Sequence, residues 1–179
     1  MSSNAQVLAR GETFYGPTKT CPTTYGADSI AAEGKEVEFF DATYRRAVKG
    51  RIMRNVSGDT LYAGQTVVHA NGYTNQRFDH STTASPDVAG VIDALLPAAG
   101  VRTGDLCIVF QEGVAKVLFP TSTSGAQGDV VIANTSGMAA VVGIASVTAP
   151  QLAVSLGRLT KTVTTTSGNT LQWVDLDVA

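Results

Sequence analysis

The sequence predicts an all-β protein: a small β-barrel or β-sandwich knob with an extended N-terminal arm and at most one short helix. Short apolar runs recur along residues 35–179, Gly-containing turns separate them, and several alternate apolar with polar residues. Short strands at regular spacing with Gly turns are typical of barrels and sandwiches. We therefore divide the chain into an N-terminal arm or loop region, residues 1–34, and a β-rich knob domain, residues 35–179.

Residues 1–34 contain both Gly and Pro and sustain no hydrophobic period. Such a stretch cannot form a helix longer than a turn or two. An extended arm that wraps a neighbour and a system of surface loops both remain open. Aromatic side chains in irregular backbone need a surface to pack on, and Phe14, Tyr15 and Tyr25 therefore favour the arm.

The first strands of the knob are expected at 35–40, 50–56 and 60–69. The turn 57–59 contains a Gly between two strand-like runs and indicates a hairpin. Gly64 breaks the last run, as a tight turn or a bulge would. The core side chains expected in this region are Leu61, Val67 and Val68.

Residues 71–86 are polar and predict a loop, but residues 86–96 are ambiguous. Ser85 suits a helix N-cap and Pro86 a first helical residue, and the apolar positions that follow lie on one helical face. A strand over the same residues explains the pattern equally well, and both remain open.

The later part of the knob is strongly β in character. The run 105–110 is apolar on both faces, which predicts a strand buried on both sides, and 111–113 is expected to turn the chain into a returning strand at 114–119. Residues 129–147 repeat the design, with 134–137 as the turn of a hairpin.

The last hairpin is expected to join residues 151–166 to residues 170–178 through a turn at 167–169. Its apolar positions change phase at Gly157–Arg158 and again after Trp173. A one-residue change of phase moves side chains to the other face, so each change predicts a bulge.

Composition excludes some functions. The net charge is −2 and the pI about 5.6, whereas a general nucleic-acid binder needs a basic face. Charged residues are only 16% of the chain, with many Gly, Ala, Ser and Thr in their place. A surface of small uncharged groups suits close packing against other protein copies.

Neither secretion nor membrane insertion is expected. The N-terminus lacks a basic region followed by an apolar one, and the apolar runs are much shorter than a membrane helix needs. The expected place of synthesis is the cytoplasm. Cys107 lies in an apolar run and reads as a core residue, while a disulfide to Cys21 stays open.

No catalytic or metal-binding motif emerges, and we predict no enzyme, cofactor or metal. Asp79, His80 and Ser81 are adjacent, but neighbours in sequence rarely converge on one atom, and His69 reads as structural. Asp175 and Asp177 are explained best as outward-facing strand positions. The glycosylation patterns beginning at Asn55 and Asn134 read as turn residues.

A basic run stands out between residues 45 and 54, formed by Arg45, Arg46, Lys49, Arg51 and Arg54. Basic residues on a strand edge deter edge pairing, which is the simplest interpretation. The functional interpretation is a patch that docks on an acidic protein surface. The candidate interface residues are Phe14, Tyr15, Tyr25, Arg45, Arg46 and Lys49.

Three stretches resemble the small capsid decoration, or cement, proteins of tailed bacteriophages: "RNVSGDTLYAGQTVV" (54–68), "GVIDALLPAAGVRTGDLCIVFQEGVAKVL" (90–118) and "GIASV" followed by "VSLGRL" (143–159). The resemblance covers roughly residues 50–160 and not the arm. It implies a β-rich knob, usually a homotrimer, that binds the major capsid protein on the capsid exterior. It implies no catalytic residue, nucleic acid or membrane.

Two other classes compete with the decoration protein. One is a different virion component, such as the base of a head fibre or a tail protein. The other is a carbohydrate-binding β-sandwich, which would expose a platform of aromatic side chains. Trp173 is the only tryptophan in the chain, and this counts against the carbohydrate-binding class.

Overall fold

The computed structural model describes residues 33–41, 46–74, 76–80, 87–94, 98–152 and 154–178. Within these residues the protein is all-β, with one short α-helix, α4 (Ala149–Leu152), and one 3-10 turn, η2 (Thr135–Gly137). The predicted class is therefore confirmed. Of the predicted arm, only residues 33 and 34 belong to the described part of the chain.

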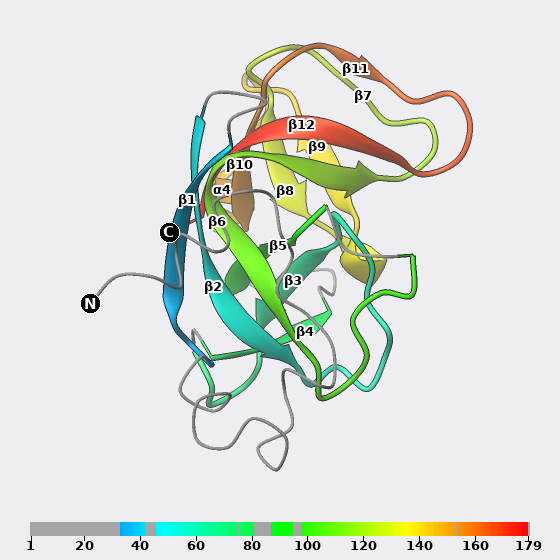
Figure 1. Ribbon diagram of the computed structural model, residues 1–179. Coiled ribbons are helices and arrows are strands. Elements are labelled where there is room, and N and C mark those ends of the chain that lie inside the picture. The colour runs from blue at the N-terminus through cyan, green and yellow to red at the C-terminus, as the bar shows by residue number, and fades with distance from the viewer. Residues whose placement is uncertain are drawn as a thin grey trace.

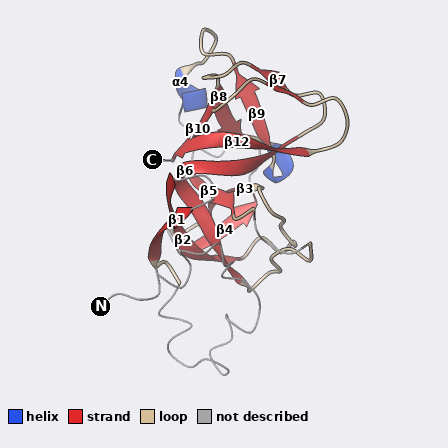
Figure 2. Cartoon of the chain, turned by 45° about the horizontal axis from the view of Figure 1, so that its top comes forward, coloured by secondary structure: helices blue, strands red, loops and turns tan. Residues whose placement is uncertain are grey.

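Most of the strands belong to one of two sets, and one long strand belongs to both (Figures 1 and 2). In chain order they are β1 (Glu36–Asp41), β2 (Arg46–Asn55), β3 (Thr66–His69), β4 (Arg77–His80), β5 (Val88–Ile92), β6 (Leu106–Phe119), β7 (Ser124–Gly125), β8 (Val130–Ala133), β9 (Ala139–Val142), β10 (Ser155–Leu159), β11 (Val163–Thr164) and β12 (Thr170–Asp177).

The first set closes into a small barrel. β2 pairs with β4 in parallel, and the antiparallel pairs β4–β3, β3–β5, β5–β6 and β6–β2 complete the ring. An apolar cluster packs here, formed by Met53, Leu61, Val67, Phe78, Ala89, Ile92, Val101, Cys107 and Val109. The predicted core positions in this region, Leu61, Val67 and Val68, are all buried.

The second set is the sheet β6-β12-β10-β8-β9, which continues from the barrel through β6 (Figure 1). A second apolar cluster joins strands of both sets, including Ile52 of β2, Ile108 of β6 and Leu156 of β10. A separate ribbon, β7 with β11, lies at the far end. The sequence left barrel and sandwich open, and the structure combines a closed ring with a further sheet.

The long strand β6 includes residues 111–113, where the sequence predicted a turn. Its first half pairs with β2 and β5, and its second half pairs with β12. The register with β2 shifts at Lys49–Gly50, which leaves Gln111 as an extra residue. Gly113 has φ of +88° inside the strand. The prediction of a turn was wrong because a bulge uses the same residues to bend a strand that has partners on both sides.

The predicted hairpin around 57–59 is also wrong, although the turn itself exists. Gly58 has φ of +81°, and the buried Asn55 side chain holds the turn by donating to the Asp59 carbonyl at 2.8 Å. The side-chain oxygen of Asn55 accepts from the Ser57 backbone N–H at 2.9 Å and from the Ser57 hydroxyl at 2.7 Å. Beyond the turn, the chain reaches β3, which pairs with β4 and β5 rather than with β2. Local turn chemistry does not choose a strand's partner.

The ambiguous segment 86–96 contains a strand, β5, with every residue buried. Gly90 has φ of +137°, and a Cβ atom there would collide with the Phe110 carbonyl of β6. The close pairing of β5 with β6 therefore requires glycine at this position. The expected loop 71–86 holds a further strand, β4, whose only fully buried side chain is Phe78.

The last two hairpins are partly as expected. β8 and β9 pair across the turn at 134–137, and β10 pairs with β12. The bulge near Gly157 is confirmed by a register shift between Ser155 and Gly157. The bulge after Trp173 is wrong, since β12 pairs with β6 without interruption. Leu152 was expected on a strand but ends α4 and is exposed.

Candidate functional site

The predicted interface residues fall mostly outside the described part of the chain. The structure does not describe four of them: Phe14, Tyr15, Tyr25 and Arg45. For Arg46 it describes only the backbone, at the start of β2. Their role stays a prediction. Lys49 is the one candidate whose side-chain surroundings are known.

Lys49 lies in a row of charges that crosses four strands. Its ammonium group contacts the Glu112 carboxylate at 2.9 Å. The register also places Glu38 of β1 opposite Lys49, and Asp177 of β12 opposite Glu112. The hydrogen bond and charge of Glu112 raise the pKa of Lys49. Lys49 is therefore paired with Glu112 of its own chain, which reduces its availability to a partner.

The described guanidinium groups of the basic run are likewise engaged within the molecule. Arg51 binds Glu36 at 3.1 Å. Arg54 binds Glu33 at 2.6 Å and donates to the Gly104 carbonyl at 2.7 Å. The run is therefore not a free positive patch over its described part, and a contact with an acidic partner would depend on Arg45 and Arg46.

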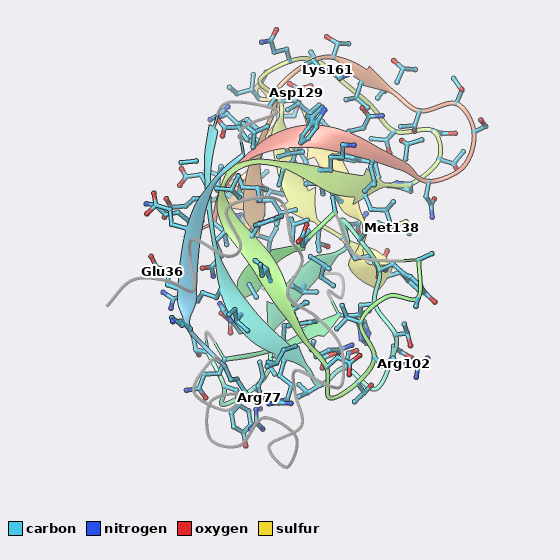
Figure 3. All side chains as sticks on the ribbon, viewed as in Figure 1. Glu36, Arg77, Arg102, Asp129, Met138 and Lys161 are labelled. Carbon is cyan, nitrogen blue, oxygen red and sulfur yellow. The ribbon has the colours of Figure 1, made fainter. Side chains whose placement is uncertain are left out.

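Glu33 binds two arginines at the barrel end, and we call this cluster the Glu33 clamp (Glu33, Arg54 and Arg77). One carboxylate oxygen accepts from Arg54 and the other from Arg77, at 2.7 and 2.9 Å between the Nε atoms and the oxygens. The Glu33 side chain is only 10% exposed. The Arg77 guanidinium also stacks on Tyr73, 4.0 Å from the ring centre. Figure 3 shows Arg77 at this end of the molecule.

The backbone next to the clamp is fixed as well. The Gly34 N–H donates to the Ile52 carbonyl at 2.7 Å, and the Ile52 N–H donates to the Lys35 carbonyl at 2.9 Å. Residues 33 and 34 thus belong to the folded knob, although the sequence assigned them to the arm. The clamp therefore holds the first described residue of the chain against the barrel.

The structure describes both histidines, His69 and His80. His80 Nδ1 lies 3.0 Å from the Asp79 carboxylate, and Ser81, the third member of the sequence pattern, lies outside the described residues. Burial lowers the pKa of His69 at the end of β3, against the opposing charge of Asp87. A neutral imidazole at the end of a strand agrees with the structural role expected for His69.

The Cys107 thiol is free and fully buried in the barrel. Burial, with the nearby charges of Asp93 and Asp105, raises its pKa well above the ordinary value. A thiol held neutral and away from solvent is a poor nucleophile. The predicted core role of Cys107 is confirmed.

Asn55 and Trp173 are less accessible than their sequence patterns suggest. The Asn55 amide is fully buried and donates to the Val101 carbonyl at 2.9 Å, so it acts as a turn residue and not as a glycan acceptor. Trp173 is half-buried, and the Lys116 ammonium group lies 5.1 Å from its ring centre. This geometry leaves little of the indole for stacking on a sugar.

In the described ranges, no cluster of three His, Cys, Asp or Glu side chains is arranged to hold a metal ion. Asp175 and Asp177 are exposed on β12. No helix among the described residues has the length and apolarity to cross a membrane.

The feature that the sequence reasoning missed is a strong separation of charge. We call residues 117–174 the low-charge lobe: its only charged residues are Asp129, Arg158 and Lys161, a share far below the 16% of the whole chain. Two of these three bind backbone within the lobe. Asp129 accepts from the Ala126 and Ile144 N–H groups at 2.8 and 3.2 Å, and Arg158 donates to the Gly128 carbonyl at 3.0 Å.

The lobe nevertheless exposes large apolar side chains. Ile144 is 57% exposed and Leu152 is 52% exposed, and both lie on the connection between β9 and β10. Figure 3 shows Asp129 and Lys161 at the opposite end of the molecule from Arg77. A charge count by segment would have found this separation in the sequence.

Neither a protein-family model nor a curated protein matches this chain.

Proposed function

We propose that this protein is a non-enzymatic virion component of the capsid-decoration type. It binds the outside of a phage capsid as a homotrimer, with the major capsid protein as its partner, and stabilises the shell across subunit seams. The observation that carries this proposal is a closed β barrel whose first described residue, Glu33, is held in place by Arg54 and Arg77.

The stretches that resemble decoration proteins support the same assignment. They supply nearly all of β6, most of β3 and β5 and the whole of β10, but only the last two residues of β2. The resemblance therefore falls on the framework of the fold. A rigid β domain suits binding between shell subunits, because little conformational entropy is lost when it binds.

The polar groups described above serve the fold, and the proposed role needs no reactive group among them. Lys49, Arg51 and Arg54 are each paired within the chain, and Cys107 is sealed in the core. Stabilisation of a shell requires only that the protein binds the assembled state more tightly than the dissociated one. Linking several weak sites in one oligomer then raises the overall affinity through effective concentration.

The test uses capsids that lack this protein. Purified protein should bind expanded heads at a saturating, fixed copy number and raise their melting temperature. Binding is measured by co-sedimentation and the position by cryo-microscopy. Heads that take up no protein, or that take it up without any gain in stability, would refute the proposal. Density on the tail or at a fibre base would assign the protein to another virion component.

The basic run gives a second measurement. Charge reversal at Arg45 and Arg46 should weaken head binding, and the defect should depend on salt because exposed charges are screened. The same reversal at Arg102, an exposed cation before β6, is the control and should leave binding unchanged. Equal effects at both places would remove Arg45 and Arg46 from the interface.

A further inference from the structure

The connection between β3 and β4 contains the only Asn-Gly pair in the chain, Asn71-Gly72. Both residues are exposed, and they form a tight turn that the Tyr73 N–H closes by donating to the Ala70 carbonyl at 2.9 Å. Gly72 has φ of +78°, in the left-handed region that glycine adopts without strain. The turn belongs to the barrel end, since the Tyr73 ring contacts the Arg77 guanidinium.

The pair places an electrophile beside a nucleophile. The Asn71 side-chain carbonyl carbon is close along the covalent chain to the Gly72 backbone nitrogen, so the nitrogen can attack this carbon and close a succinimide ring. Asparagine is among the thermally labile residues. A side chain on the following residue shields the attacking nitrogen, whereas glycine has no side chain and leaves the nitrogen open.

The surroundings of the turn leave room for this attack. In the described part of the connection, the Tyr73 N–H makes the hydrogen bond of the turn and the Gly72 N–H makes none. A Cβ atom added at Gly72 would meet no atom within 4 Å, so the turn has open space in which to rearrange. Asn55 is held differently, because its buried amide donates to two carbonyl groups. Asn71 has no comparable restraint among the described residues.

We propose that Asn71 is a site of spontaneous deamidation. The Gly72 nitrogen loses its proton to solvent base and forms a bond to Asn71 Cγ, and the bond from Cγ to Nδ2 breaks as Nδ2 takes up a proton and leaves as ammonia. Water then opens the ring at either of its carbonyl carbons. Opening at Cγ gives aspartate with the original backbone, and opening at the main-chain carbon gives isoaspartate. Each product carries one more negative charge than the native protein, and the only co-reactant is water.

The chain contains a matched comparison in Gly168-Asn169, which lies between β11 and β12. Asn169 is exposed, Gly168 has φ of +67°, and a Cβ atom at Gly168 would also meet no atom within 4 Å. The order of the two residues is reversed, so the nitrogen that follows this asparagine belongs to Thr170, which carries a side chain and begins β12. The two asparagines are alike in exposure, but only Asn71 is followed by an open nitrogen.

The test uses the native full-length protein without a capsid, so its result does not depend on the proposed function. Samples incubated in buffer are taken at intervals and digested, and peptide mass spectrometry measures the replacement of NH2 by OH at each asparagine. Conversion at Asn71 should be faster than at Asn169 by about tenfold or more. The rate should rise with pH, because the Gly72 nitrogen must lose its proton, and isoaspartate should form part of the product.

Variants locate the reaction, and circular dichroism checks that each of them is folded. Gly72→Ala shields the nitrogen and should slow conversion at Asn71 by about tenfold, and its added methyl group meets no neighbour. Asn71→Gln should greatly reduce the acidic forms that ion exchange separates, because glutamine would have to close a larger ring, whereas Asn169→Gln should leave these forms unchanged. Conversion at Asn71 that is no faster than at Asn169 would overturn the inference, and so would an unchanged rate in Gly72→Ala.

Discussion

At the scale of single residues, buried polar side chains hold the barrel end together. Glu33 receives two arginines from strands that are distant in sequence, and Asn55 satisfies its amide with three backbone or hydroxyl partners in one turn and a fourth on Val101. Removing one partner from such a group leaves the others buried and unpaired, which costs more than the net gain from forming the contact.

Glu33→Gln should lower the free energy of unfolding by about 2–3 kcal/mol, because Arg54 and Arg77 lose their shared carboxylate in a largely buried cluster. Glu36→Gln is the control, since Glu36 pairs with Arg51 but its side chain is 60% exposed. That change should cost less than about 0.5 kcal/mol. Both are measured by urea unfolding, and equal losses would contradict the structural role of the clamp.

Asp105 gives a prediction about pH. Desolvation raises the pKa of this carboxyl, against the Arg102 backbone N–H and the charges of Arg102 and Arg54. Because its folded pKa is above the unfolded one, the folded state binds the proton more tightly. This contribution is complete below the unfolded pKa and is lost as pH rises through the folded pKa.

Asp105→Asn removes the ionisation while keeping an oxygen for the Arg102 N–H, which lies 3.2 Å from Asp105. Its stability relative to the native protein should therefore increase as pH rises from about 3 to 6 and then stay constant. Urea unfolding at a series of pH values measures this difference. A difference that is the same at every pH would show that the carboxyl titrates alike in both states.

At the scale of elements, glycines determine where strands come closest. Gly157 lies at the bulge of β10 with φ of +144°, and a Cβ atom there would collide with the Asp175 carbonyl of β12. A backbone atom in a paired strand cannot move aside as a flexible side chain can. The bulge and the close pairing of β10 with β12 therefore both depend on this residue.

Gly157→Ala should destabilise the protein by more than about 3 kcal/mol, since strain and collision act together. Gly168→Ala is the matched control: φ is +67°, but no atom lies near the added methyl group. It should cost only about 1 kcal/mol. Thermal unfolding followed through Trp173 fluorescence compares the two variants, and a similar loss in both would mean that backbone conformation alone matters.

At the scale of the whole molecule, one end carries the charge and the other end carries almost none. The barrel end holds the Glu33 clamp, and the low-charge lobe holds β9, whose four residues are uncharged. β6 passes through both parts, and the second apolar cluster includes strands of each. The two ends can therefore meet different partners while folding as one unit.

Two truncations distinguish the role of residues 1–32 from the role of Glu33. Removing residues 1–32 keeps Glu33 and should change the free energy of unfolding by less than about 0.5 kcal/mol while weakening head binding. Removing residues 1–33 should add the loss expected for Glu33→Gln. Urea unfolding and co-sedimentation with heads measure the two effects. Equal loss of stability in both truncations would contradict the clamp, and full head binding without residues 1–32 would refute the arm.

The sequence by itself determined the all-β class, the buried strand at 105–110, the hairpin around 134–137 and the bulge near Gly157. These features follow from side-chain periodicity and glycine positions, which act over a few residues. Cys107 as a core residue follows from the same local signal. The sequence also contained the charge separation, but only a count by segment makes it visible.

Only the tertiary structure decided which strands pair. The turn at 57–59 and the bend at 111–113 carry the same local signals as hairpins, yet β2 closes a ring with β4 and β6, and β6 continues as one strand. The pairing of Lys49 with Glu112 and of Glu33 with two arginines joins residues far apart in the chain. Contacts of this kind depend on the burial of whole faces, and no short window of sequence contains that information.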